Sequence, residues 1–502
     1  MKKMILFTLT AVLLCLLSLA AMVYAHGQLT NRGEDVAVTE TTLFGDKKEA
    51  EGITLTTSGR FVSDDLGKAL FWKSISSQRS GGLHTKSSFR FNKADDWYAD
   101  AAAAPFIYVE VIAGIPERSY EALASLLDDD LKEAIAAAAK DIQPGQTSTQ
   151  IVSLSDYTDS FPLYFQVLFK DHDDAVLAGD FFHFPLTKDD RWKISVAKDA
   201  EGRLKTVSMK PVADIMIQQR EAFDDRDNLY LAVTGFSQSY EDWNIPENRR
   251  GVLRIPLTGD TGQSLGGHSS SKDQSASDQA VYPDLARAEL LYPIDTEAIL
   301  LAAETDCYRN NLLLFTEEDG QIRLSVIGLD DGQLKQKLTV FADTDNTSDI
   351  YPEVRVREEY ILIWNESQGS DFLYLCPEDS AGNADDGGTD DDSTDSVTDG
   401  GTGKYRVEGQ SSIDGVLPEG YRVDKLEDAF DGQRLAIVCM PYDEALRELN
   451  STYLMVFRKS EMVYAGRYDN SLDSVYQAYS YRTRVQPVIS PKTPKIEIDG
   501  RL

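Results

Sequence analysis

A short acidic segment, residues 343–349, has the side chains that come closest to a metal-ligand set. It reads Asp-Thr-Asp-Asn-Thr-Ser-Asp, so Asp343, Asp345 and Asp349 alternate with other oxygen-bearing side chains. Calcium takes six to eight oxygen ligands, and such a loop suits it, although the central Gly and the final Glu of an EF-hand loop are missing. These three aspartates are the candidate metal ligands and calcium the candidate cofactor. The alternative is an acidic turn that only aids solubility.

Two tryptophans stand beside acid and amide groups. Trp243 lies in Glu-Asp-Trp-Asn and Trp364 in Leu-Ile-Trp-Asn-Glu-Ser. Aromatic faces combine a large apolar surface with a polar edge and can stack on sugar rings. Trp243 and Trp364 are therefore the candidate binding residues for a glycan, with packing in or around the core as the alternative.

The spacings that signal catalysis are absent from the sequence. There is no Gly-x-Ser-x-Gly, no His-Glu-x-x-His and no Gly-rich phosphate loop between a strand and a helix. Ser269 and Lys272 have a Ser-x-x-Lys spacing, but they lie in a polar Gly/Ser-rich stretch and not at the start of a helix. A carboxylate pair for glycoside hydrolysis could come from any of 83 acidic residues, so the catalytic residues stay unknown.

The net charge of −33 restricts the partners. Nucleic acid binds through Lys and Arg side chains that displace counterions, so this acidic chain is not expected to bind it. The same repulsion disfavours an anionic lipid surface.

The residues from 214 to 490 show paired apolar runs separated by polar turns. Residues 228–236 precede 251–259, residues 298–305 precede 311–318, residues 360–365 precede 371–376, and residues 434–442 precede 451–458. Asp-Gly pairs at 319–320 and 331–332 are typical of hairpin turns. This repetition predicts a mainly β, β-propeller-like domain of antiparallel sheets, with a pair of β-sandwiches as the alternative. Polar inserts at 259–280 and 377–404 are expected to be disordered, and residues 491–502 form a tail.

The residues from 42 to 211 predict a separate α+β domain, preceded by a linker at 26–41. Strand-like runs flank one helical stretch between Pro116 and Pro144. Its leucines at 123, 126, 127 and 131 and Ile135 recur at helical spacing, so one face should be buried.

The first 25 residues predict export. Two lysines precede an uncharged apolar run from Met4 to Ala25, which is either a signal peptide cleaved before His26 or a retained transmembrane helix. The body of the protein would then be extracytoplasmic, either membrane-anchored or secreted. Of the four cysteines, Cys376 and Cys439 lie in strand-like apolar runs and are expected to fill core space.

Two segments carry a resemblance to known proteins. The runs Thr-Leu-Phe-Gly-Asp-Lys-Lys (residues 42–48) and Lys-Ala-Leu-Phe-Trp-Lys-Ser (68–74), placed after the apolar segment, resemble uncharacterised exported proteins of Gram-positive anaerobic bacteria. The resemblance covers roughly residues 1–210 and implies an N-terminal anchor before a β-rich extracellular part, with no activity.

These observations favour a non-enzymatic binding or sensing protein that faces the cell wall or the medium. A glycan hydrolase with a carboxylate pair and an accessory subunit of a membrane complex are the alternatives. The partner is a wall or extracellular ligand, or a membrane protein.

Overall fold

The protein was analysed as a computed structural model. The structure describes residues 17–18, 20, 37–62, 68–93, 107–125, 127–169, 172–213, 216–237, 250–259, 281–295, 298–341, 352–365, 371–378, 403–413, 415–417, 422–442, 451–471, 488–491 and 494–498.

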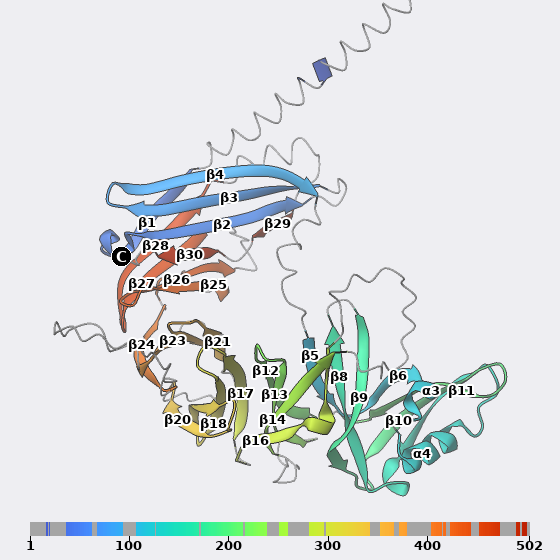
Figure 1. Cartoon of the computed structure of the whole chain (residues 1–502). Helices are drawn as coiled ribbons and strands as arrows, with labels where there is room; N and C mark the ends of the chain where they lie inside the picture. The colour runs from blue at the N-terminus through green and yellow to red at the C-terminus, as the bar shows by residue number, and fades with distance from the viewer. Residues whose placement is uncertain are drawn as a thin grey trace, which may run out of the picture. The chain divides into compact units, whose positions relative to one another are not determined.

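The described part is mainly antiparallel β-structure, as the sequence predicts (Figure 1). The chain divides into two compact units. The first comprises Met1–Ala103, Glu359–Cys376 and Arg406–Leu502, and the second comprises Ala104–Glu358 and Pro377–Tyr405.

One sheet of the first unit joins the two ends of the chain. Its strands are β2 (Ile53–Val62), β3 (Lys68–Arg79), β4 (Gly82–Lys93), β29 (Val488–Pro491) and β30 (Lys495–Ile498). β2 pairs with β3 along one edge, and with β29 and then β30 along the other. Figure 1 shows β2, β3 and β4 as long neighbouring arrows. Part of the expected tail is therefore a strand of this sheet.

The second sheet of the same unit also combines distant segments. Its order is β1-β28-β27-β26-β25, with bounds β1 Val38–Gly45, β25 Arg422–Phe430, β26 Leu435–Tyr442, β27 Ser451–Arg458 and β28 Glu461–Asn470. β1 starts inside the expected linker and pairs antiparallel with β28, from Val38 opposite Asn470 to Gly45 opposite Tyr464. The short helix η2 (Lys47–Ala50) follows β1.

A four-stranded sheet has the order β21-β22-β23-β24. The bounds are β21 Pro352–Val356, β22 Ile361–Asn365, β23 Asp371–Pro377 and β24 Tyr405–Ser412. β22 pairs with β23 as predicted, and all five residues of β22 are buried.

Two sheets of the second unit repeat the same plan. One contains β12 (Met216–Phe223), β13 (Asn228–Ser237), β14 (Gly251–Gly259), β15 (Val281–Pro283) and β16 (Glu289–Pro293), with helix η5 (Leu285–Arg287) before β16. The other is β17 (Ile299–Asp306), β18 (Asn311–Glu318), β19 (Gln321–Gly328) and β20 (Leu334–Thr339). The predicted pairs β13–β14 and β17–β18 are confirmed. The Asp319–Gly320 turn has positive φ at both residues, which a tight hairpin requires.

The remaining strands form a three-stranded sheet, β5-β8-β9, and an α+β layer. The bounds are β5 Ile107–Ile112, β6 Ile115–Ser119, β7 Thr147–Ser153, β8 Ser160–Phe169, β9 His172–Pro185, β10 Arg191–Lys198 and β11 Leu204–Pro211. In the sheet β6-β11-β10-β7, one face packs against α3 (Tyr120–Leu123) and α4 (Asp129–Ala139). Helix η3 (Leu154–Asp156) follows β7.

The single helix expected after Pro116 is wrong in its extent. Pro116 lies in β6, and the helical stretch is divided into α3 and α4. Asp128 adopts an extended conformation and accepts a hydrogen bond from the Leu131 N–H (2.7 Å), so it caps a new helix. Leu123, Leu127, Leu131 and Ile135 are buried as predicted.

The strands expected to form one domain over 42–211 divide between the two units. β1 to β4 belong to the first unit, because their sheet partners come from the C-terminal end of the chain. β5 to β11 belong to the second unit.

Candidate functional site

A polar cluster of the second unit starts at the turn between β12 and β13. The Asp224 side chain is fully buried there. Its carboxylate accepts hydrogen bonds from the Arg226 N–H (2.9 Å), from both the backbone N–H and the side-chain amide of Asn228 (2.9 and 2.8 Å), and from the Tyr230 hydroxyl (2.9 Å). Asp227 completes the turn with a φ of 59°.

These hydrogen bonds set the charge state of the turn. Burial alone would raise the pKa of Asp224, but the donors of Asn228, Tyr230 and Arg226 outweigh it and lower that pKa. The pKa of Tyr230 is raised, first by burial and then by its hydrogen bond to the Asp224 carboxylate. Asp224 is therefore a carboxylate and Tyr230 a neutral phenol at neutral pH.

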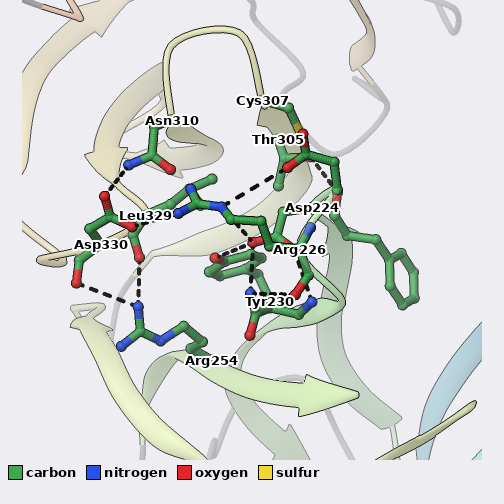
Figure 2. Close-up of polar contacts among 12 residues, drawn as sticks. Asp224, Arg226, Tyr230, Arg254, Thr305, Cys307, Asn310, Leu329 and Asp330 are labelled. Carbon is green, nitrogen blue, oxygen red and sulfur yellow. Dashed lines mark hydrogen bonds and ion pairs between the residues drawn. The ribbon is translucent and has the colours of Figure 1, made fainter. Parts of the chain in front are cut away.

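The cluster continues onto the neighbouring sheet through Asp330 (Figure 2). Arg226 Nη1 donates to one oxygen of Asp330 (3.0 Å), and Asn310 Nδ2 donates to the other (2.6 Å). Arg254 of β14 donates through Nη1 to the backbone carbonyl of Leu329 (2.9 Å). The turns after β12, β17 and β19 are thereby tied together at one end of two sheets.

The exposed edge of this cluster carries both charge signs. The side chains of Arg226 and Asp330 are 50% and 67% exposed. Arg254 forms an ion pair with Glu289, with its Nε donating at 2.6 Å. The two guanidinium groups are already paired with carboxylates, so the cluster offers hydrogen-bonding groups held in fixed positions and not a free nucleophile or base. We call these four residues, Arg226, Arg254, Glu289 and Asp330, the turn-end surface.

A second buried network fixes the root of the acidic insert. Asp306, with a fully buried side chain, accepts a hydrogen bond from the Tyr405 hydroxyl and pairs with Arg309 (3.2 Å). Asn311 donates to the Gly403 carbonyl (3.0 Å), and Lys335 donates to the Asn311 side-chain oxygen (2.6 Å). The two ends of the insert lie side by side, because the Glu378 N–H donates to the Lys404 carbonyl (3.1 Å).

Glu304 of β17 is an acid outside these networks whose pKa is raised. Burial raises its pKa, and only the neighbouring Thr305 N–H opposes this effect (3.2 Å). A raised carboxyl pKa is one property of a general acid.

Of the site residues predicted from the sequence, the structure describes Trp364 but not Trp243 or the three aspartates. Trp364 is 3% exposed and stacks on Phe372, with ring centroids 6.1 Å apart, in a core cluster that also contains Cys376 and Cys439. It therefore presents no ring face to a ligand. Cys376 and Cys439 are buried, as expected, and both are free thiols. Trp243, Asp343, Asp345 and Asp349 lie outside the described residues.

No metal centre is evident within the part of the chain that the structure describes. In those residues, no three His, Cys, Asp or Glu side chains are grouped to hold an ion. The calcium prediction falls on residues outside that part, and it stays a prediction.

The turn residues were missed by the sequence reasoning, although a repeated pattern marks them. Asp224, Asp306 and Asp431 each begin the turn between the first and second strands of a sheet, in Asp-Asp-Arg-Asp-Asn, Asp-Cys-Tyr-Arg-Asn and Asp-Gly-Gln-Arg. Asp431 accepts hydrogen bonds from the Gln433 and Arg434 N–H groups (2.9 and 2.7 Å). An Asp followed three or four residues later by Arg or Asn, before an apolar run, was the available signal.

The apolar segment at residues 1–25 lies almost wholly outside the described residues. Across the residues that are described, no helix combines the length and apolar character that crossing a bilayer requires.

Comparisons with known proteins give no family. No family model and no curated protein matches the chain. Among solved structures, a complex of KlAtg21 with the coiled-coil of AgAtg16 is 9% identical and covers 60% of this chain and 95% of its own, with a TM-score of 0.21. TolB from Acinetobacter baumannii is 10% identical and covers 78% of this chain and 99% of its own, with a TM-score of 0.21. NanB with Optactamide is 10% identical and covers 86% of this chain and 98% of its own, with a TM-score of 0.24.

Proposed function

We propose that the successive sheets are blades of a propeller-like scaffold. Two features of the separate units support this. In the second unit β5 lies against β12, β12 against β17 and β17 against β21, so the first strands of successive sheets are neighbours. In the first unit the N-terminal strand β1 completes the sheet built from β25 to β28, which is how a ring of sheets avoids a free end.

The function that we infer is non-enzymatic binding or sensing outside the cell membrane. The observation that carries it is the turn-end surface. Its buried floor at Asp224 is saturated with hydrogen bonds, while Arg226 and Asp330 remain half-exposed or more. A rigid polar surface with paired charges suits recognition, because its groups need not be reordered when a ligand binds. The apolar N-terminal segment supports the location.

The location is tested on intact cells that make the native protein. Protease added to intact cells should cleave the chain beyond residue 25, and the membrane fraction should retain a fragment with the Met1 terminus. A mature chain that begins at His26 in the medium would make the protein secreted. Full protection from protease until the cells are broken would exclude an outward-facing body.

The binding surface is tested by co-sedimentation of the purified full chain with isolated cell envelopes. R226Q should weaken co-sedimentation, because it removes the Arg226–Asp330 pair that presents both groups. The matched control is R467Q in the first unit, where a 41% exposed arginine pairs with Asp469 at 2.9 Å. Equal binding by wild type, R226Q and R467Q would remove the turn-end surface from the proposal. Turnover of envelope glycans by the wild type would replace the binding function with the hydrolase alternative.

A further inference from the structure

The face of the sheet β6-β11-β10-β7 that points away from α3 and α4 carries a cluster of positive charge, on a protein of net charge −33. Successive residues of a strand point to opposite faces. In β10, Trp192, Ile194 and Val196 are buried in the core cluster beneath α4. Arg191, Lys193, Ser195 and Ala197 therefore point to the other face, where Arg191 and Lys193 are exposed.

The strand register places a second lysine beside the first. Lys193 stands directly opposite Lys210 of β11, and directly opposite Ile151 of β7 on its other side. Facing residues have Cβ atoms about 5 Å apart, and residues two apart along a strand are about 6.8 Å apart. Arg191, Lys193 and Lys210 thus gather within the reach of one small anion.

This arrangement costs the folded state free energy. Like charges directly opposite each other on a sheet repel. Among the residues that the structure describes, none forms a salt bridge with Arg191, Lys193 or Lys210. A bound anion would remove the repulsion.

The middle of the same face is lined with hydroxyl groups. Ser195 stands opposite Ser208 of β11 and opposite Thr149 of β7, and the Thr149 and Ser195 hydroxyls are hydrogen-bonded at 2.8 Å. Ile151, 65% exposed, adds an apolar contact at the positively charged end. The face therefore offers cations at one end and hydroxyl donors and acceptors along its centre, and further along it the Glu117 carboxylate accepts a hydrogen bond from the Thr206 hydroxyl (3.2 Å).

We propose that this face, defined by Arg191, Lys193, Lys210, Thr149, Ser195 and Ser208, binds a polymer of phosphodiester-linked polyol units. Phosphate has several acceptor oxygens and suits the fork of Arg together with two lysines. The polyol hydroxyls match the Ser and Thr groups. The inference rests on the proposed function in one respect, since an exported chain is the one that meets such a polymer outside the membrane.

The lack of stacking groups favours this occupant over single-stranded nucleic acid. The outward positions of β7, β10 and β11 named above carry no aromatic ring, and proteins that hold single strands use such rings for stacking.

The test is calorimetric titration of the purified full chain, in neutral detergent, with a synthetic glycerol-phosphate oligomer. K193Q/K210Q should raise the Kd by about tenfold or more, because it removes two of the three positive charges that would contact the phosphates. The matched control is K132Q/K140Q, which removes the same charge from the helix that covers the opposite face of the sheet. The control should stay within about twofold of the wild type, as expected for side chains outside the site.

Other results would overturn the proposal. These are no binding by the wild type, equal weakening in both double variants, or equally tight binding of poly-glutamate. Preference for phosphatidylglycerol vesicles over the oligomer would assign the face to a lipid surface instead. K193Q/K210Q should be at least as stable to urea as the wild type, which excludes misfolding as the cause of lost binding. Because the titration uses purified protein, its failure is distinguishable from a failure of the location experiment.

Discussion

Three aspartates hold turns between strands by accepting hydrogen bonds. Asp224, Asp306 and Asp431 each lie at a turn and accept hydrogen bonds from N–H groups that the turn would otherwise leave without partners. A carboxylate is suited to this role because it offers two acceptor oxygens and no donor. The acidity of the chain is thus partly structural and not only a means of solubility.

Asp224→Asn should destabilise the protein at neutral pH by about 2–3 kcal/mol, because an amide NH2 would then face donors that now meet an oxygen. The folded-state pKa of Asp224 is lowered, so its stabilising contribution is present above the ordinary Asp pKa of about 3.9. That contribution is lost as pH falls through the lowered pKa. Urea unfolding of the wild type and Asp224→Asn at pH 7 and at about pH 3 should show that the difference in their free energies of unfolding narrows on acidification.

The control for this prediction is Asp225→Asn. Asp225 is adjacent in sequence and its side chain is 71% exposed. The free energy of unfolding of Asp225→Asn should match that of the wild type within about 0.5 kcal/mol. A difference in the free energy of unfolding between wild type and Asp224→Asn that does not change with pH would contradict the assignment of Asp224 as a carboxylate.

At the scale of elements, short local signals decide where strands and helices start and stop. The leucine spacing after Pro116 correctly identifies a buried face, but it extends across a boundary that the hydrophobic pattern does not show. α3 ends at Leu123, and Asp128 starts the next helix, because its side chain replaces a missing hydrogen-bond partner at the N-terminus of α4.

Asp128→Ala should lower the free energy of unfolding by about 1 kcal/mol, the usual effect of losing an N-cap. Asp129→Ala is the matched change one residue later, where the side chain is 99% exposed and pairs only with Lys132 at 3.2 Å. It should cost about 0.5 kcal/mol or less. Thermal unfolding followed by circular dichroism compares the two, and equal losses would mean that the cap contributes nothing beyond its charge.

At the scale of the whole molecule, the two ends of the chain depend on each other. β1 pairs with β28, and the Tyr464 hydroxyl donates to Glu40 of β1 (2.7 Å). Arg458 forms an ion pair with Glu49 (2.9 Å) just after β1. The N-terminal strand is thus part of a sheet whose other strands begin almost 400 residues later.

A chain that begins at residue 47 should be markedly less stable than one that begins at residue 37. Both lack the apolar segment, so they differ only in β1 and its border. We expect a loss of roughly 2–4 kcal/mol in urea unfolding, since each ladder hydrogen bond contributes about 0.5–1.5 kcal/mol net. The shorter chain should also self-associate, because β28 becomes an exposed edge, and size-exclusion chromatography would detect this. Identical, monomeric behaviour of the two chains would show that β1 is dispensable.

Local patterns in the sequence predict the mainly β character, the pairing of neighbouring strands and the burial of Cys376 and Cys439. These follow from apolar runs and turn residues that act over a few positions. Only the tertiary structure decided that β1 pairs with β28, that Arg226 meets Asp330, and that Lys193 faces Lys210. A strand's alternation specifies which side chains are buried but not which distant edge its backbone joins, because every edge offers the same N–H and C=O groups.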